Sequence, residues 1–251
     1  MQDELRIIPL RGIGEVRAGD DLAALILHAL AAQQLELCDG DVLVVTQKIV
    51  SKAEGRLIDP QSVEPSAFAQ QIAAAGRKDA HYQEVVLRES RRIVKMASGV
   101  LITETHHGFI CANAGVDESN VGGGGLITLL PEDSDRSAVQ LRAAIHIQRG
   151  VTVAVIISDT FGRPWREGQV NVAIGVAGID PLVDYVGVDD PYGYTMHASA
   201  IAIGDELASA AELVMGKIDG VPVAVIRGYS YTPTESSAQR LVRDPRFDLF
   251  R

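Results

Sequence analysis

Long apolar runs alternate along the chain with polar and glycine-rich segments, and this pattern predicts buried strands joined by helices and loops. The apolar runs lie at residues 5–10, 42–45, 100–104, 151–157 and 221–226. Many of their side chains are β-branched, as is typical of strands. The run at 151–157 is nearly continuous, so we expect a strand that is buried on both faces.

Helices are expected where apolar residues recur at helical spacing. One begins after residues 19–21, others are expected at 64–75, 134–149 and 199–215, and residues 79–95 should hold a helix followed by a strand. The helical side chains expected to face the core include Leu141, Ile145 and Ile147, together with Leu207 and Leu213.

The order of these elements implies an α+β or mixed α/β architecture and not a simple doubly wound sheet. We treat residues 1–251 as a single unit. In the alternative, the chain forms two lobes. The middle of the chain is then an inserted lobe, bounded by loops near Asp79 and Gly193.

Composition narrows the class of protein. The chain is 47% hydrophobic and 22% charged, as is usual for a soluble globular protein. Its net charge of −10 and its lack of a basic tract argue against nucleic-acid binding. Cys38 and Cys111 have apolar neighbours and are expected to be buried thiols, without a disulfide or a metal. We expect no signal peptide and no membrane-spanning helix, and hence a cytoplasmic protein.

Candidate chemistry follows the strand at 151–157. We expect this strand to stop at Ser158, which would place Asp159 and Thr160 at its mouth, before a loop that carries Arg163 and Arg166. Asp and Thr oxygens suit a hard cation, and Arg suits phosphate or carboxylate. The alternative to a binding site is a structural turn, in which Asp159 makes an Asx hydrogen bond and both arginines are solvated.

Two other segments carry polar groups of the same kind. Lys48 and Lys52 follow the strand at 42–45, where they either meet phosphate or begin a solvated helix. The glycine-rich loop at 112–125 offers Asp117 and Asn120 as ligands of a metal and a nucleotide. Neither a dinucleotide fingerprint nor a P-loop is present. Oxygen ligands near cationic side chains favour Mg²⁺ or Mn²⁺ that bridges nucleotide phosphates, and so predict a metal-assisted phosphate or nucleotide enzyme.

Four segments extend this interpretation. They read DGDVLVVTQKIVSKAEGRLID, CANAGVDESNV, VIISDTFGRPWREGQVNVAIGVAGIDPL and AELVMGKIDGVPVAVIRG. In order and spacing, from about Ile8 to Gly228, they resemble the coenzyme F420-0:L-glutamate ligase family, also called F420-0:γ-glutamyl ligase.

The resemblance implies a GTP-dependent ligase of coenzyme F420 biosynthesis. Such an enzyme joins one or more L-glutamates to the terminal carboxylate of coenzyme F420-0, first by an amide and then in γ-linkage. It also implies an unusual mixed α/β fold, an intertwined homodimer, two Mg²⁺ or Mn²⁺ ions and stimulation by K⁺. Some family members carry a C-terminal nitroreductase-like domain, for which we expect no room in 251 residues.

The resemblance also assigns residues. Asp117 and Asp159 are expected to bind one metal and Thr160 the second. Apart from the resemblance, we expect Lys48, Arg163 and Arg166 to act in catalysis. The residues expected to contact the nucleotide are Arg11, Gly12, Ile13, Gly14, Gln47, Lys48, Lys52, Asn120, Met215, Gly216, Lys217, Ile218, Asp219, Gly220, Val221 and Pro222.

Two departures from the family pattern matter. Lys217 stands where Gln, a possible second-metal ligand, is frequent, and the loop after it is one residue shorter. An ammonium has no lone pair for a cation, so Lys217 is expected to meet phosphate directly. In the early loop, Arg11 and Gly14 replace the acidic and Pro residues that are usual in the family.

The expected reaction needs an activated acid, because amide formation from a carboxylate is uphill in water. We hypothesise an acyl phosphate made with GTP, with Arg163 or Arg166 binding the carboxylate of the incoming glutamate. Two alternatives are kept: a related acid-amine ligase with another phosphorylated carboxylate acceptor, and a nucleotide-binding module without catalysis.

Overall fold

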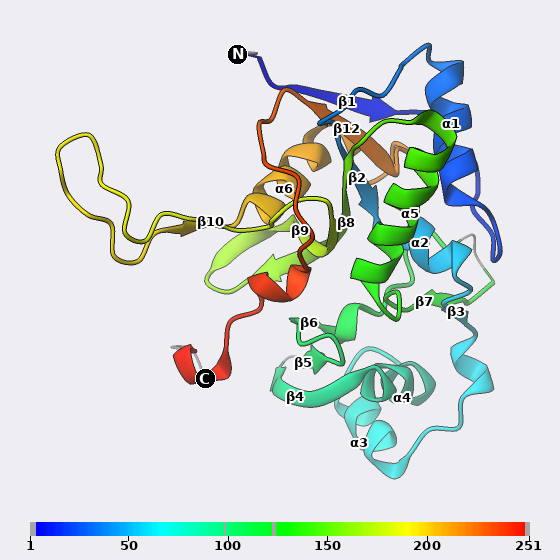
Figure 1. The fold of residues 1–251 in the computed structure, drawn as a ribbon. Coiled ribbons are helices and arrows are strands. Elements are labelled where there is room, and N and C mark those ends of the chain that lie inside the picture. The colour runs from blue at the N-terminus through cyan, green and yellow to red at the C-terminus, as the bar shows by residue number, and fades with distance from the viewer. Residues whose placement is uncertain (1–3, 98, 122–123, 249–251) are drawn as a thin grey trace.

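A mixed five-stranded sheet forms the centre of the molecule (Figure 1). The computed structural model describes residues 4–97, 99–121 and 124–248. The strands lie in the order β1 (Arg6–Leu10), β12 (Val223–Arg227), β2 (Val42–Thr46), β8 (Ala154–Arg163) and β9 (Arg166–Ala177). Strands β2 and β8 pair in parallel, whereas the other neighbouring pairs are antiparallel. The predicted mixed architecture is confirmed.

Helices cover both faces of this sheet, which explains its continuous apolar runs. On one face, α1 (Leu22–Ala32), α2 (Gln47–Ala53) and α5 (Ser134–Arg149) pack against side chains that include Leu43 and Val45. On the other face, α6 (Ile203–Met215) packs against Val42 and Val44. Successive side chains of a strand point to opposite faces, so β2 contributes to both cores.

A further layer, residues 57–129, has a hydrophobic cluster of its own and lies beyond one end of the central sheet (Figure 1). Its elements are β3 (Leu57–Ile58), α3 (Ala67–Ala75), α4 (Ala80–Arg88), β4 (Ser90–Ala97), β5 (Val100–Thr105), β6 (Ile110–Ala112) and β7 (Ile127–Thr128). We call this segment the outer layer. The predicted inserted lobe, bounded by loops near Asp79 and Gly193, has other bounds and stays a prediction.

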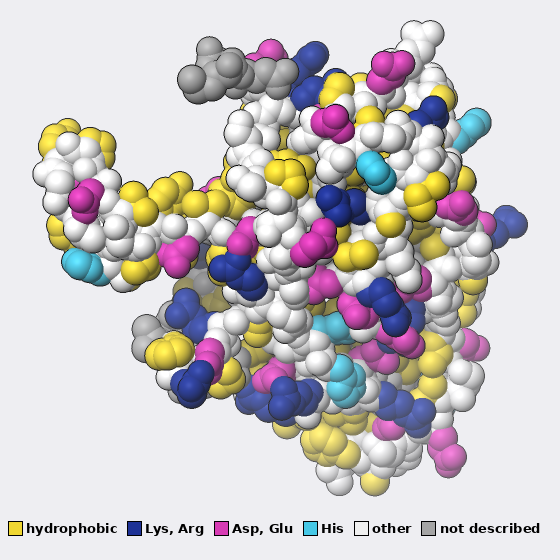
Figure 2. Space-filling view, viewed as in Figure 1, with side chains coloured by type: hydrophobic (Ala, Val, Ile, Leu, Met, Phe, Trp, Pro, Cys, Tyr) yellow, Lys and Arg dark blue, Asp and Glu magenta, His cyan; other side chains and the backbone are white. Residues whose placement is uncertain are grey.

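An arm extends away from the rest of the molecule between β10 (Val183–Asp184) and β11 (Ala200–Ile201) (Figure 1). Hydrophobic side chains are exposed along this arm in Figure 2. Tyr192 and Tyr194 are 95% and 62% exposed. In the part of the chain that the structure describes, no helix combines the length and apolarity needed to span a membrane.

Several details of the sequence prediction are wrong. Ile147 and Leu213 are 82% and 83% exposed, although both were expected in the core. At 100° per residue, Ile147 lies about 200° around α5 from buried Ile145, so it faces solvent. Leu213 is likewise rotated away from the buried face of α6 that contains Leu207. Cys38 is exposed in the turn before β2, while Cys111 is buried as expected, and both are free thiols.

Candidate functional site

Asp159 and Thr160 lie within strand β8, and the expectation that this strand stops at Ser158 is wrong. The strand continues to Arg163 because it pairs with β9, and Arg163 faces Arg166 across a tight turn. A register shift between Ile157 and Ser158 marks an irregularity just before the two functional residues. Such bulges re-aim side chains and are frequent beside active sites. Asp159 and Thr160 are therefore held by a hairpin and not by a free loop.

A cavity of about 460 Å³ opens where the parallel pairing of β2 with β8 ends. Thr46 and Ser158 form the last pair of this ladder, and both line the cavity. Ligands of open α/β sheets bind outside the carboxyl ends of the strands. The expected site residues that line it are Ile13, Gly14, Gln47, Lys48, Lys52, Asn120, Asp159, Thr160, Gly216, Lys217, Ile218, Gly220, Val221 and Pro222.

The remaining expected residues lie elsewhere. Arg11, Gly12 and Asp219 are exposed and do not line this cavity. Met215, the last residue of α6, is buried in the core. Asp117 reaches the site through its contact with Lys48.

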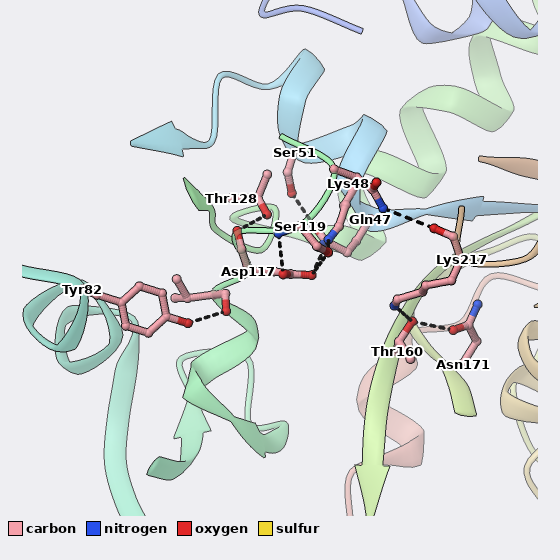
Figure 3. A network of polar contacts seen from close by, with 12 residues as sticks. Gln47, Lys48, Ser51, Tyr82, Asp117, Ser119, Thr128, Thr160, Asn171 and Lys217 are labelled. Atoms are coloured by element: carbon pink, nitrogen blue, oxygen red, sulfur yellow. Dashed lines mark hydrogen bonds and ion pairs between the residues drawn. The ribbon is translucent and has the colours of Figure 1, made fainter. Parts of the chain in front are cut away.

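Lys48 and Asp117 form an ion pair that joins α2 to the outer layer (Figure 3). The Lys48 ammonium also donates to Ser119 Oγ at 3.0 Å. The Ser119 backbone N–H and hydroxyl donate to Asp117 at 2.8 and 2.9 Å. Burial opposes ionisation of Asp117, but the Lys48 and Ser119 contacts outweigh it and hold the pKa of this carboxyl below its usual value. Asp117 is thus a fixed, ionised carboxylate, and the lysine is not part of a solvated helix start.

Tyr82 supports the backbone next to Asp117. The buried Tyr82 hydroxyl donates to the Val116 carbonyl oxygen at 2.9 Å. The backbone φ angles are 52° at Asn113, 55° at Ala114 and 57° at Asn120. Residues other than glycine seldom adopt positive values of φ. Backbone strain of this kind concentrates at functional sites, where surrounding contacts hold it in place.

The opposite wall of the cavity is a chain of hydrogen bonds that begins at Lys217 (Figure 3). The Lys217 ammonium donates to Thr160 Oγ1 at 3.1 Å, and this hydroxyl donates to Asn171 Oδ1 at 2.8 Å. Asn171 in turn donates to Glu212 Oε2 at 2.9 Å. The Asn120 amide donates to the Lys217 backbone carbonyl at 3.4 Å. The chain therefore ties the middle of the β8–β9 hairpin to α6 and to the loop after it.

Asp159 lies between these two groups of contacts. Burial raises the pKa of Asp159 to about 6, and the nearby Asp117 carboxylate also raises it, whereas the Thr160 backbone and the Lys48 and Lys217 ammonium groups lower it. A carboxyl with this balance is stabilised in its ionised form by any further cation that enters the cavity.

Two buried polar atoms of the cavity wall have no hydrogen-bond partner among the described residues. They are Gln47 Nε2 and Ser158 Oγ. The Gln47 oxygen is satisfied, because it accepts from Ser51 Oγ at 2.7 Å. Buried polar atoms are usually hydrogen-bonded, and an unpaired one requires an explanation such as a bound ligand. Lys52, only 6% exposed, pairs with Glu15 at 2.5 Å on the same wall.

The donor set fits one hard divalent cation at Asp117 and Asp159. Among residues 4–97, 99–121 and 124–248, no three His, Cys, Asp or Glu side chains gather as a candidate metal site. Mg²⁺ is commonly held by one or two carboxylates, with waters and substrate phosphates completing its shell. Both candidate ligands contact an ammonium, Asp117 that of Lys48 and Thr160 that of Lys217. The Asp117 carboxylate offsets the charge of its lysine, whereas the Thr160 hydroxyl is neutral, so a second cation fits poorly at Thr160.

A second cavity of about 790 Å³ lies farther along the same hairpin. Phe161, Arg163 and Trp165 line it together with Cys111, and Lys95 and Arg243 bring further positive charge. The Arg163 guanidinium donates to the Glu167 carbonyl at 2.7 Å. Arg166 is exposed and lines neither cavity. Arg163 and Asp159 thus belong to neighbouring cavities.

Sequence analysis missed several residues of the site. Asn171, Glu212 and Ser158 line the first cavity, and Tyr82 supports Asp117 from outside it. Asn171 is the polar residue within the otherwise apolar run of β9, which is a signal that can be read from sequence. Glu212 and Tyr82 carry no comparable signal, because helices at the protein surface contain many such residues.

Comparisons with known proteins identify the family of this chain. The family model described as F420-0:Gamma-glutamyl ligase matches residues 12–228. The protein named coenzyme F420:L-glutamate ligase in Methanothermobacter thermautotrophicus is 45% identical over 250 residues, which cover 98% of this chain and 99% of that protein. Its namesake in Methanopyrus kandleri is 47% identical over 252 residues, 98% of each chain. The namesake in Methanocaldococcus jannaschii is 43% identical over 219 residues, 87% of each. Because the family model matches residues 12–228, which is most of the chain, and these relatives are 43–47% identical to it, the chain belongs to the F420-0:γ-glutamyl ligase family.

Proposed function

We propose that this protein is a GTP-dependent ligase that joins L-glutamate to the terminal carboxylate of coenzyme F420-0, once or repeatedly. The family membership and the names of the close relatives support the glutamate ligase activity. The observation that carries the proposal is the first cavity, where the Lys48 and Lys217 ammonium groups face the Asp159 carboxyl. This arrangement suits a triphosphate and its metal ion.

The nucleotide occupies the first cavity in this proposal. Its phosphates lie near Lys48 and Lys217, which act as positively charged hydrogen-bond donors. Asp117 and Asp159 hold a divalent cation, Mg²⁺ or Mn²⁺, which when bound neutralises phosphate charge. The unpartnered Gln47 Nε2 donor is available to a nucleotide oxygen. The proposed K⁺ stimulation rests on the family resemblance alone.

The chemistry proceeds in two steps. A carboxylate oxygen of F420-0 attacks the γ-phosphorus of GTP, the bond from that phosphorus to the β-phosphate oxygen breaks, and GDP leaves. The glutamate amine then attacks the acyl carbon, inorganic phosphate departs with the former carboxylate oxygen, and the amine loses a proton to water or a base. Lys48 and Lys217 stabilise the negative charge of the transferring group. No side chain needs to become a covalent nucleophile.

The second cavity receives the acceptor and glutamate in this proposal. Phe161 and Trp165 offer aromatic surface for a planar ring, and Arg163 offers a guanidinium for a carboxylate. Arg163 is favoured over Arg166 for the glutamate carboxylate, because Arg166 lies outside both cavities.

A homodimer is proposed as the functional unit. Tyr185, Val186, Val188, Tyr192 and Tyr194 expose apolar surface on the arm between β10 and β11. An exposed apolar surface of this kind marks an interaction site in a soluble protein. A second copy of the chain that accepts the arm would bury these side chains and account for the expected intertwined assembly.

The deciding experiment supplies F420-0 with its terminal carboxylate labelled with ¹⁸O, together with L-glutamate, GTP and Mg²⁺. We expect a product whose mass rises by one glutamate per turnover, GDP, and inorganic phosphate that carries one ¹⁸O. Unlabelled phosphate with normal product excludes the acyl phosphate. Product formed only from a different phosphorylated acid supports the related-ligase alternative. Tight GTP binding without glutamate-dependent GDP release indicates the non-catalytic module.

A further inference from the structure

Lys217 projects from the loop after α6 into the wall that contains Thr160. Lys217 is exposed to solvent, but its side chain points toward strand β8. The ammonium lies 3.1 Å from Thr160 Oγ1 (Figure 3). The Lys217 backbone is tied to the opposite loop by the Asn120 amide, 3.4 Å from its carbonyl oxygen. The position of this positive charge is therefore fixed by contacts at both ends of the residue.

The polar side chains next to this ammonium already take part in hydrogen bonds. Thr160 donates its only hydroxyl proton to Asn171 Oδ1 at 2.8 Å, so its lone pairs face the Lys217 donor. The Asn171 amide nitrogen donates to Glu212 Oε2 at 2.9 Å. Thr160 and Asn171 thus each donate to an acceptor, and the Lys217 ammonium is the charged donor of this chain of hydrogen bonds.

We infer that the Lys217 ammonium is a built-in replacement for a second divalent cation at Thr160, so that nucleotide binding needs one metal ion, held by Asp117 and Asp159. This inference rests on the proposed nucleotide function. An ammonium donates hydrogen bonds and carries positive charge, but it has no lone pair and cannot itself bind a metal. A divalent ion at Thr160 would stand beside a like charge, whereas a phosphate oxygen there gains a charged donor.

The test counts metal ions directly. Mn²⁺ is titrated into the intact protein with a saturating GTP analogue whose β,γ-bridge is an imido group, and free Mn²⁺ is measured by electron paramagnetic resonance. We expect one bound Mn²⁺ per chain in the wild type. The Lys217→Gln variant removes the charge and adds an amide oxygen, so we expect two bound Mn²⁺ and a second-site affinity at least tenfold above that of the wild type.

The Lys217→Arg variant is the matched control, because it keeps the positive charge and should still bind one Mn²⁺. Thermal unfolding checks that each variant is folded. Two Mn²⁺ in the wild type, one in Lys217→Gln, or two in Lys217→Arg would each overturn the inference. Calorimetry of the same samples measures binding of the analogue itself, and wild-type protein that does not bind it contradicts the proposed function instead.

Discussion

Lys48 on α2 and Asp117 in the outer layer form an ion pair across the boundary between the central sheet and that layer. The Lys48 side chain is 15% exposed and the Asp117 side chain 39% exposed, so bulk water screens the pair incompletely. The same two residues lie beside Asp159, whose carboxyl responds to both charges. The pair thus sets the electrostatics of the cavity and also fixes one wall of it.

Replacing Asp117 with Asn should abolish turnover and leave the fold intact. The amide cannot supply the negative charge expected to hold the metal ion, so we expect glutamate-dependent GDP release to fall by at least about 100-fold. Glu118→Gln is the matched control, because Glu118 pairs with Lys78 on the outside and should keep near-normal activity. Full activity in Asp117→Asn would refute its metal role.

Removing the Tyr82 hydroxyl should loosen the support of Asp117. In Tyr82→Phe the buried Val116 carbonyl loses its 2.9 Å donor. We expect the free energy of unfolding to fall by about 1–2 kcal/mol, which corresponds to a Tm lower by about 3–6 °C. Turnover should fall less than in Asp117→Asn. An unchanged Tm would show that the hydroxyl does not stabilise this loop.

Gly175 on β9 is required by close backbone packing. A Cβ at this position would lie 2.3 Å from the Ser134 carbonyl oxygen, and a backbone atom cannot move aside as a flexible side chain can. We expect Gly175→Ala to lower the free energy of unfolding by about 2–3 kcal/mol or more. Gly162→Ala, on the same hairpin but in open space, is the control and should change stability little. Chemical denaturation measures both, and equal effects would contradict this account.

The two thiols should differ sharply in reactivity. Burial, with the nearby Asp159 carboxylate, raises the pKa of Cys111 to about 12. At pH 8 only about one Cys111 in ten thousand is then a thiolate, the reactive form. Iodoacetamide should therefore label the exposed Cys38 first, as mass spectrometry of Cys38→Ser and Cys111→Ser variants can show. The labelling rate of Cys111 should rise with pH up to that pKa, and rapid labelling at pH 8 would contradict its burial.

The arm should be needed for dimerisation. The double substitution Tyr192→Ser and Tyr194→Ser removes two exposed aromatic rings without disturbing a buried core. We expect it to convert a dimer into a monomer in light scattering at the same concentration, with unchanged secondary structure. Val139→Ser on exposed α5 surface is the control. A dimer that survives the double change would place the interface elsewhere.

Local sequence signals found Lys48 and Lys52 because both follow a buried strand directly, and they found Asp117 because it lies in a long loop rich in small residues. The strand-to-helix step at Thr46 behaves as the pattern predicts. These signals depend on neighbours in the sequence. The family resemblance then assigned roles that the local pattern had left open.

Other features depend on contacts between distant segments, which one sequence does not reveal. The sequence pattern predicts that β8 ends at Ser158, whereas its pairing with β9 beyond Ser158 is set by register across the hairpin. The bond from Asn171 to Glu212 joins β9 to α6 across 41 positions. Ile147 was misplaced because an apolar residue type does not decide which side of a helix faces water.

One strand carries residues of both cavities, with Asp159 in the first and Arg163 in the second. A strand advances about 3.3 Å per residue, so their backbones stand about 13 Å apart. Strand β8 is hydrogen-bonded along its length to β9, which prevents it from shortening or lengthening. The hairpin therefore sets a fixed backbone interval between the two cavities, and the nucleotide and acceptor of the proposed reaction would have to span it.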